Sequence, residues 1–355
     1  MNDDRMATMT EATRLTREGR LPEAMKLIQG ALGSSEPGAG PAKAGTPVPV
    51  MALPGIKHLR PVRTERGLKP APPGAQFVAA RYAGPSGART YRLYVPSGYD
   101  GREVPLVVML HGGTQSAGDF AAGTLMNELA ERDVFLVAYP EQATAANSMR
   151  YWNWFQPEHQ ATGAGEPSII AGITLKIMGE YAVEAARVYI AGFSAGGAMA
   201  AVMAATYPDL YAAAGIHSGL AYGAAHDLPS AYAAMSKGPA TRTWRPARGV
   251  PLIVFHGDRD SIVGHVNAES LVADTLGTIG SGAVRSQERG RAPAGHAYTR
   301  TIYKNPGGRT LAEQWSIHDA GHAWSGGSSR GSYTDARGPD ASAEMIRFFS
   351  EQPEA

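Results

Sequence analysis

The sequence contains no cysteine, no strong excess of charge and no long hydrophobic run. Zero cysteines among 355 residues exclude disulfides, cysteine nucleophiles and thiolate metal sites. The 33 basic and 32 acidic residues give a formal charge of +1, which shows no overall bias toward nucleic acid or an anionic membrane surface. No apolar stretch approaches the roughly 20 residues of a membrane-spanning helix. We therefore expect neither a nucleic-acid nor a membrane partner.

The pattern of an export signal is also missing. The chain starts Met1-Asn2-Asp3-Asp4-Arg5, which is polar and acidic rather than basic and then apolar. The absence of cysteine fits a reducing compartment. These observations predict a cytoplasmic location, and they leave the oligomeric state open.

Composition divides the chain into three parts. Residues 10–32 carry apolar side chains at helical spacing, which predicts a short helical N-terminal extension over residues 1–32. Gly, Pro, Ala and Ser dominate residues 33–75, a composition typical of a linker. Residues 76–355 form the main domain, which is long enough to bury a large core.

Segments with strand and helix patterns alternate through the main domain. Arg89–Val95 alternates apolar and polar residues, as an antiparallel strand does, whereas Val104–Leu110 is continuously apolar, as a strand covered on both faces is. Further strands are expected at 134–139, 187–191, 212–217, 250–256 and 314–318, helices at 117–132, 169–181, 195–207, 266–276 and 339–351, a polar excursion at 221–248 and an irregular hairpin at 282–305. The alternation predicts an α/β fold with a doubly wound, mostly parallel sheet flanked by helices.

A serine between two glycines follows the strand expected at 187–191. The stretch reads Gly192-Phe193-Ser194-Ala195-Gly196, and a helix is expected directly after it. This is the pattern of the nucleophile elbow of α/β-hydrolases, where a sharp strand-to-helix turn exposes the serine hydroxyl. Because G-x-S-x-G also occurs by chance, the interpretation needs catalytic partners elsewhere in the chain.

A serine nucleophile needs a histidine as general base and a carboxylate to orient that histidine. In α/β-hydrolases the order along the chain is serine, acid, histidine. We expect His322 as the base because it lies in a glycine-flanked loop after the last strand, whereas its rival His318 falls inside that strand. Asp258 and Asp260 compete as the acid. Asp260 is favoured because it lies further into its loop, and Asp258 is expected to bond nearby backbone amides.

Two backbone amides are candidates for the oxyanion hole. The strand at 104–110 runs into His111-Gly112-Gly113-Thr114-Gln115, where a glycine pair allows close approach of the backbone to a substrate oxygen. We expect the N–H groups of Gly113 and Ala195 to be the donors. By contrast, one histidine and one acid, His256 and Asp258, do not make a metal site, and no phosphate- or dinucleotide-binding fingerprint is present. The sequence thus predicts no metal and no cofactor.

As an ordered set, these motifs resemble the polyhydroxybutyrate (PHB) depolymerase family of esterases, which includes feruloyl and acetylxylan esterase-like enzymes. The resemblance covers roughly residues 89–349 and rests on Leu110–Gln115, Tyr151–Phe155, Gly192–Gly197, His217–Gly219, His256–Asp260 and Gly321–Gly327. It implies a serine carboxylic ester hydrolase that acts through an acyl-enzyme on hydroxyalkanoate oligomers or polyesters, or on aryl esters such as ferulates. Ser194 would be the nucleophile, Asp260 the acid and His322 the base.

The resemblance also bears on the surroundings of the site. It implies that Trp324 and the tryptophan-rich stretch Tyr151-Trp152-Asn153-Trp154-Phe155 border the ester. We expect Trp154, Trp324 and Thr114 to contact the substrate and Trp152 to pack. Many relatives carry a cysteine at the positions of Gly113 and Tyr151, and those two cysteines are expected to pair.

Two other function classes stay open on the sequence. One is a different acyl-transfer enzyme with the same triad, such as a peptidase or an acyltransferase. The other is a non-catalytic protein of this fold that binds a granule or another partner. Labelling by a fluorophosphonate separates the second class from the enzymes.

Overall fold

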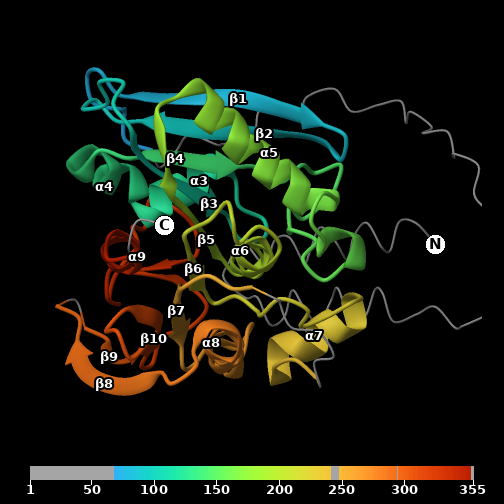
Figure 1. Ribbon diagram of the computed structural model, residues 1–355, viewed down its shortest axis with the longest axis vertical. Coiled ribbons are helices and arrows are strands. Elements are labelled where there is room, and N and C mark those ends of the chain that lie inside the picture. Colours follow the sequence, from blue (N-terminus) through green and yellow to red (C-terminus); the bar gives the residue numbers. More distant parts are fainter. Residues whose placement is uncertain (1–67, 241–247, 294, 353–355) are drawn as a thin grey trace, which may run out of the picture. The chain divides into compact units, whose positions relative to one another are not determined.

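The computed structural model describes residues 68–240, 248–293 and 295–352 (Figure 1). All of these belong to the unit Glu65–Ala355, one of the two compact units of the chain. The helical extension predicted at 1–32 and most of the linker predicted at 33–75 lie outside the described residues.

A ten-stranded sheet forms the centre of the described unit, in the order β1-β2-β4-β3-β5-β6-β7-β10-β9-β8 (Figure 1). The six strands from β4 to β10 in this order are parallel, and antiparallel pairs flank them at both ends. The bounds are β1 Gln76–Gly84, β2 Gly87–Val95, β3 Val104–Leu110, β4 Leu136–Pro140, β5 Val183–Phe193, β6 Ala213–His217, β7 Leu252–Gly257, β8 Val284–Arg291, β9 Ala297–Lys304 and β10 Thr310–Ile317. The predicted mostly parallel sheet is confirmed.

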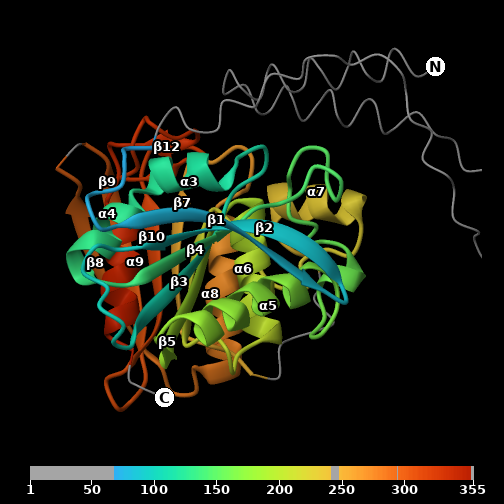
Figure 2. The same ribbon diagram turned by 90° about the horizontal axis from the view of Figure 1, so that it is seen from above.

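Helices cover both faces of the sheet. α3, α4 and α9 lie on one face and α5, α6 and α8 on the other (Figure 2). The bounds are α3 Ala117–Thr124, α4 Met126–Asp133, α5 Gly165–Glu180, α6 Ala195–Thr206, α7 Leu228–Lys237, α8 Val266–Ile279 and α9 Ala341–Ser350, with a 3-10 turn at Pro157–His159. Within the residues described, none of these helices has the length and apolar character needed to cross a bilayer.

The helix predicted at 117–132 is two helices, α3 and α4. Leu125 between them has a φ of 60°, in the left-handed region that ends a helix. The carbonyl oxygens of Gly123 and Thr124 accept hydrogen bonds from the Ser328 N–H at 2.8 Å and the Ser342 hydroxyl at 2.6 Å. Because distant residues occupy these carbonyls, the backbone does not continue as one helix.

The polar excursion predicted at 221–248 contains a helix that the sequence analysis missed. α7 begins after Asp227, whose carboxylate accepts the Ser230 N–H at 2.8 Å, and Pro229 lies in its first turn. The strand predicted at 314–318 is β10, which ends at Ile317, so His318 lies just beyond it rather than inside it.

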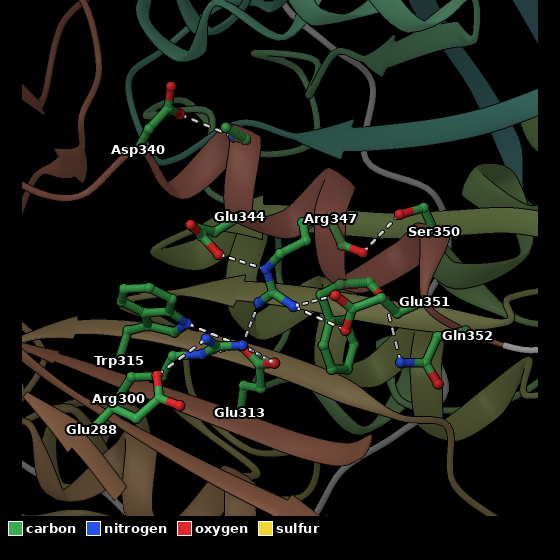
Figure 3. A network of polar contacts seen from close by, with 12 residues as sticks. Glu288, Arg300, Glu313, Trp315, Asp340, Glu344, Arg347, Ser350, Glu351 and Gln352 are labelled. Carbon is green, nitrogen blue, oxygen red and sulfur yellow. Dashed lines mark hydrogen bonds and ion pairs between the residues drawn. The ribbon is translucent and has the colours of Figure 1, made fainter. Parts of the chain in front are cut away.

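A buried carboxylate joins the sheet to α9 (Figure 3). Glu313 of β10 is 0% exposed and receives the guanidinium of Arg300 from β9 in a bidentate pair at 2.8 and 3.1 Å. Arg347 of α9 donates to the same carboxylate at 2.7 Å, and the indole of Trp315 donates at 3.3 Å. This network fixes α9 against the antiparallel end of the sheet.

Candidate active site

Ser194 lies on the sharp turn between β5 and α6. Its φ of 55° is strained for a residue with a side chain, and its N–H donates to the carbonyl oxygen of His217 at 2.9 Å. A Cβ on Gly192 would collide with the carbonyl of Gly196, and one on Gly196 would collide with the carbonyl of Leu110. The turn therefore requires glycine at both positions, and it brings the start of α6 against the end of β3.

A chain of hydrogen bonds joins Ser194, His322 and Asp260. The serine Oγ lies 2.9 Å from His322 Nε2, and His322 Nδ1 lies 2.6 Å from Asp260 Oδ2. The three side chains come from the ends of β5, β7 and β10, which meet at the same edge of the parallel sheet. All three are nearly buried: Ser194 is 9% exposed, and the side chains of His322 and Asp260 are 7% and 0% exposed.

Asp260 is held in an ionised state. Burial alone would raise its pKa, but the adjacent imidazole of His322, that of His256 and the backbone N–H of Val263 hold the pKa of this carboxyl well below its usual range. Its second oxygen accepts the N–H groups of Ile262 and Val263, each at 2.9 Å. The fixed carboxylate accepts the Nδ1–H of His322 and leaves Nε2 to accept the serine proton.

The two rival residues pair with each other. Asp258 Oδ2 lies 2.9 Å from His318 Nδ1, and its Oδ1 accepts the N–H of Asp319 at 2.8 Å. Both side chains are more than one third exposed, at 37% and 40%. This second pair joins the loop after β7 to the end of β10.

The candidate oxyanion donors lie on adjoining segments. No described residue accepts a hydrogen bond from the N–H of Gly113 or of Ala195. The aromatic ring of Tyr151 packs where a Cβ of Gly113 would lie, so the positions expected to hold paired cysteines in relatives are neighbours here. In this chain the ring of Tyr151 and the glycine at 113 occupy these two positions.

Each of three loops around this site is held by a buried histidine, a role that the sequence did not predict for these residues. His111 Nε2 accepts the N–H of Gln142 at 3.0 Å. His217 Nε2 accepts the N–H of Ser325 at 3.0 Å, just after His322. His256 Nε2 donates to the carbonyl oxygen of Val263 at 2.7 Å and lies 3.5 Å from Asp260 Oδ2. In the sequence, all three share one pattern that could have identified them, because each lies at or just after the end of a buried strand.

Burial keeps these three imidazoles neutral. Desolvation lowers the pKa of His111 and of His256 to about 4, and it lowers the pKa of His217 well below its usual value. A neutral ring with one donor and one acceptor nitrogen can join two specific backbone groups. Protonation would break the hydrogen bonds in which Nε2 of His111 and Nε2 of His217 accept a backbone N–H. It would leave the bond that His256 Nε2 donates to Val263 in place.

The residues expected to contact substrate lie in different surroundings. Trp324 is 1% exposed and packs in the core against Phe120 and His217, so its ring does not line an open cleft. Trp154 is 6% exposed. Trp152 is fully buried, as predicted for packing, and donates to the carbonyl oxygen of His111 at 3.1 Å.

A buried carboxylate that the sequence analysis missed organises the tryptophan-rich loop. Glu166 of α5 is 1% exposed and accepts the backbone N–H and the side-chain amide of Asn153, each at 2.8 Å. It also accepts from Gln142, and from Arg89 at 3.3 Å. This network fixes the loop that presses Tyr151 onto Gly113.

In the part of the chain that the structure describes, no group of three or more His, Asp or Glu side chains could hold a metal ion.

The sheet order, the parallel core and the serine on the turn after β5 define an α/β-hydrolase. Residues 89–292 match the family described as esterase PHB depolymerase, and the chain belongs to that family.

Curated relatives carry related names. The chain is 32% identical over 241 residues to poly(3-hydroxyalkanoate) depolymerase C of Paucimonas lemoignei, across 64% of this chain and 57% of the relative. It is 31% identical over 140 residues to feruloyl esterase B of Thermothelomyces thermophilus, across 39% of this chain and 47% of the relative. The chain thus spans about half the length of these relatives.

A solved structure supports the fold. An acetyl xylan esterase from Aspergillus awamori superimposes with a TM-score of 0.61 at 20% identity, covering 78% of this chain and 99% of that one. At this level of identity the comparison identifies the shared α/β-hydrolase architecture alone.

Proposed function

We propose that this protein is a serine carboxylic ester hydrolase in which Ser194 is the nucleophile, His322 the general base and Asp260 the acid that orients the base. The observation that carries the proposal is the continuous chain of contacts, 2.9 Å from serine to imidazole and 2.6 Å from imidazole to carboxylate. Membership of the PHB depolymerase family gives independent support.

The proposed reaction proceeds in two steps through an acyl-enzyme. His322 Nε2 takes the proton of Ser194 as the hydroxyl attacks the ester carbonyl carbon, and then gives it to the departing alcohol. Water, activated by the same nitrogen, attacks the acyl-serine and releases the acid. Asp260 stabilises the imidazolium that forms in both steps.

The N–H groups of Gly113 and Ala195 are proposed to hold the oxyanion. Neither amide has an acceptor among the described residues, and the two segments that carry them adjoin where Gly196 meets the end of β3. Removing one such donor typically costs a factor of about 10²–10³ in kcat. We also propose that Thr114 and Trp154 lie on the substrate side. Trp324 is proposed to act from the core through Phe193, whose ring packs against both Trp324 and His322.

The proposed substrates are hydroxyalkanoate oligomers or polyesters, and aryl esters of the feruloyl type. The names of the poly(3-hydroxyalkanoate) depolymerase and feruloyl esterase relatives support these classes. The serine is nearly buried, at 9% exposed. This favours an ester chain that can reach the hydroxyl as substrate, rather than an ester held within an extended flat surface.

The test is a substrate panel run on the wild type and on Ser194→Ala. Nitrophenyl esters, hydroxybutyrate oligomers and methyl ferulate are compared with matched amides and with added alcohol acceptors. We expect ester hydrolysis that Ser194→Ala reduces by a factor of about 10⁶. The matched control is Ser230→Ala, a serine in the first turn of α7 whose hydroxyl accepts the N–H of Asp227 at 3.0 Å.

The other function classes are outcomes of the same experiment. Amide cleavage would indicate a peptidase, and transfer to alcohol in preference to water would indicate an acyltransferase. A folded wild type that takes no fluorophosphonate label at Ser194 would contradict catalysis and favour a binding protein. The cytoplasmic location stays a prediction from composition, and cell fractionation with an antibody to the protein tests it.

A further inference from the structure

The loop that follows the candidate base reaches the candidate oxyanion segment. β11 (Trp324–Ser325) pairs in parallel with β12 (Thr334–Asp335), which encloses residues 326–333 in a loop directly after His322. The N–H of Ser328 in this loop donates to the carbonyl oxygen of Gly123 in α3 at 2.8 Å. Because α3 begins just after Gln115, the 326–333 loop lies over the segment that carries Gly113.

A first tie joins the loop to this segment through Asp119 of α3. The N–H of Ser332 donates to Asp119 Oδ1 at 3.0 Å, and its hydroxyl donates to Oδ2. The side-chain amide of Gln115 donates to Asp119 Oδ2 at 2.9 Å and to the carbonyl oxygen of Ser332 at 3.2 Å. Its oxygen accepts the N–H of Gly112 at 2.9 Å. The residue before Gly113 is therefore fixed through the 326–333 loop.

A second tie fixes the residue after Gly113. The hydroxyl groups of Thr114 and Tyr333 lie 2.9 Å apart, although 219 residues separate them in the chain. Both residues have a positive φ, 64° and 53°, in the left-handed region that is strained for a β-branched or aromatic residue. Strain of this kind persists only where surrounding contacts hold it, and it concentrates at functional sites.

We infer that Tyr333 is a positioning residue that fixes, through Thr114, the direction in which the N–H of Gly113 points. The inference rests on the proposed function. Glycine has no side chain to restrict its backbone, so the orientation of its peptide depends on its neighbours. With Gly112 tied to Gln115 and Thr114 tied to Tyr333, the Gly113 amide is held from both sides. The same loop starts beside His322, so it sets the spacing between the base and the oxyanion donor.

The test compares Tyr333→Phe, Thr114→Val and the double variant on a nitrophenyl ester. Each single variant is expected to lower kcat by about tenfold, a part of the full loss of an oxyanion donor, with KM changed less than about twofold. The double variant is expected to be no slower than the slower single one, because both changes remove the same hydrogen bond. Thr114→Ser keeps the hydroxyl that meets Tyr333, so it is expected to lose less kcat than Thr114→Val.

A second readout does not depend on activity. Amide hydrogen exchange of the peptide spanning residues 111–116 is expected to accelerate in Tyr333→Phe and in Thr114→Val. The matched control is Tyr207→Phe, which removes a hydroxyl that accepts the N–H of Gly163 at 2.8 Å. It is expected to change neither kcat nor exchange at 111–116.

The outcomes separate the two proposals. Unchanged kcat and unchanged exchange in Tyr333→Phe would overturn the inference, as would a double variant whose losses multiply. Faster exchange in a protein whose wild type hydrolyses no ester would support the positioning role and contradict the proposed function instead.

Discussion

At the scale of single residues, two acid–histidine pairs compete for one catalytic role. Asp260 and His322 meet in a buried position next to Ser194, whereas Asp258 and His318 meet at the surface. The spacing of acid and histidine along the chain is nearly the same in the two pairs. Burial and contact with the serine therefore favour Asp260 and His322 as the pair that would serve catalysis.

Asparagine variants of the two acids test this choice. Asp260→Asn is expected to lower kcat by a factor of about 10⁴, because an amide neither orients the imidazole correctly nor stabilises its charged form. Asp258→Asn is expected to change kcat less than about threefold, because exposed ion pairs contribute little. Steady-state kinetics on one ester measures both, and equal losses would contradict the assignment of Asp260.

The sequence predicted Ser194 and His322 from local context, but it only favoured Asp260 over Asp258. The elbow needs glycines at fixed positions around the serine, so its signal is local. The direction of each aspartate is set by partners about 60 residues away, His322 and His318, which no local pattern reveals. The core position of Trp324 was hidden for the same reason, since the aromatic residues around it come from α3, β5 and β6.

At the scale of elements, the buried carboxylate of Glu313 joins β9, β10 and α9 (Figure 3). It neutralises the guanidinium groups of Arg300 and Arg347, which are both partly buried. The side chain of Arg347 is 29% exposed. Removing a buried partner leaves charges without compensation. This position is thus more sensitive than the exposed acids around it.

Glu313→Gln is expected to destabilise the protein by about 3–5 kcal/mol, because Arg300 and Arg347 lose their buried counter-charge. Its matched control is Glu351→Gln, an exposed partner of the same Arg347, which is expected to cost no more than about 1 kcal/mol. Urea denaturation measures both free energies of unfolding. A loss in Glu313→Gln as small as that of the control would contradict the structural role.

Among the elements, the continuous apolar strands and the helices after them were predicted within a few residues. The predicted boundaries are wrong where contacts between distant residues determine the backbone conformation. The helix at 117–132 breaks because Ser328 and Ser342 bind its carbonyls, and β10 ends one residue earlier than predicted, at Ile317. α7 was missed, despite the capping signal of Asp227 and Pro229, because the Arg- and Pro-rich residues 237–248 dominate the composition of the 221–248 stretch.

At the scale of the whole molecule, the buried neutral histidines link stability to pH. An unfolded imidazole binds a proton below about pH 6.5, whereas folded His111 and His256 do so only near pH 4. Between these values the unfolded state binds more protons, so acidification lowers the free energy of unfolding. Each such histidine contributes a slope of up to about 1.4 kcal/mol per pH unit.

We therefore expect the free energy of unfolding to be nearly constant from pH 8 to 7 and to fall steeply from pH 6.5 to 4.5. Urea midpoints across this range measure the slope, and calorimetry in buffers of different ionisation heat measures proton uptake on unfolding. His226→Gln, at a side chain 78% exposed, is the control and leaves the slope unchanged. Proton uptake near zero at pH 5.5 would contradict the prediction.

The order of the strands has a consequence for synthesis. β10 lies between β7 and β9 in the sheet, and it precedes both His322 and the 326–333 loop in the chain. A ribosome completes the serine turn well before it makes these segments. A nascent chain that has folded only as far as the loop after β7 thus carries the proposed nucleophile Ser194 and the proposed acid Asp260 but not the proposed base His322. We therefore expect hydrolytic competence only after β10 and the loop that follows it have left the exit tunnel.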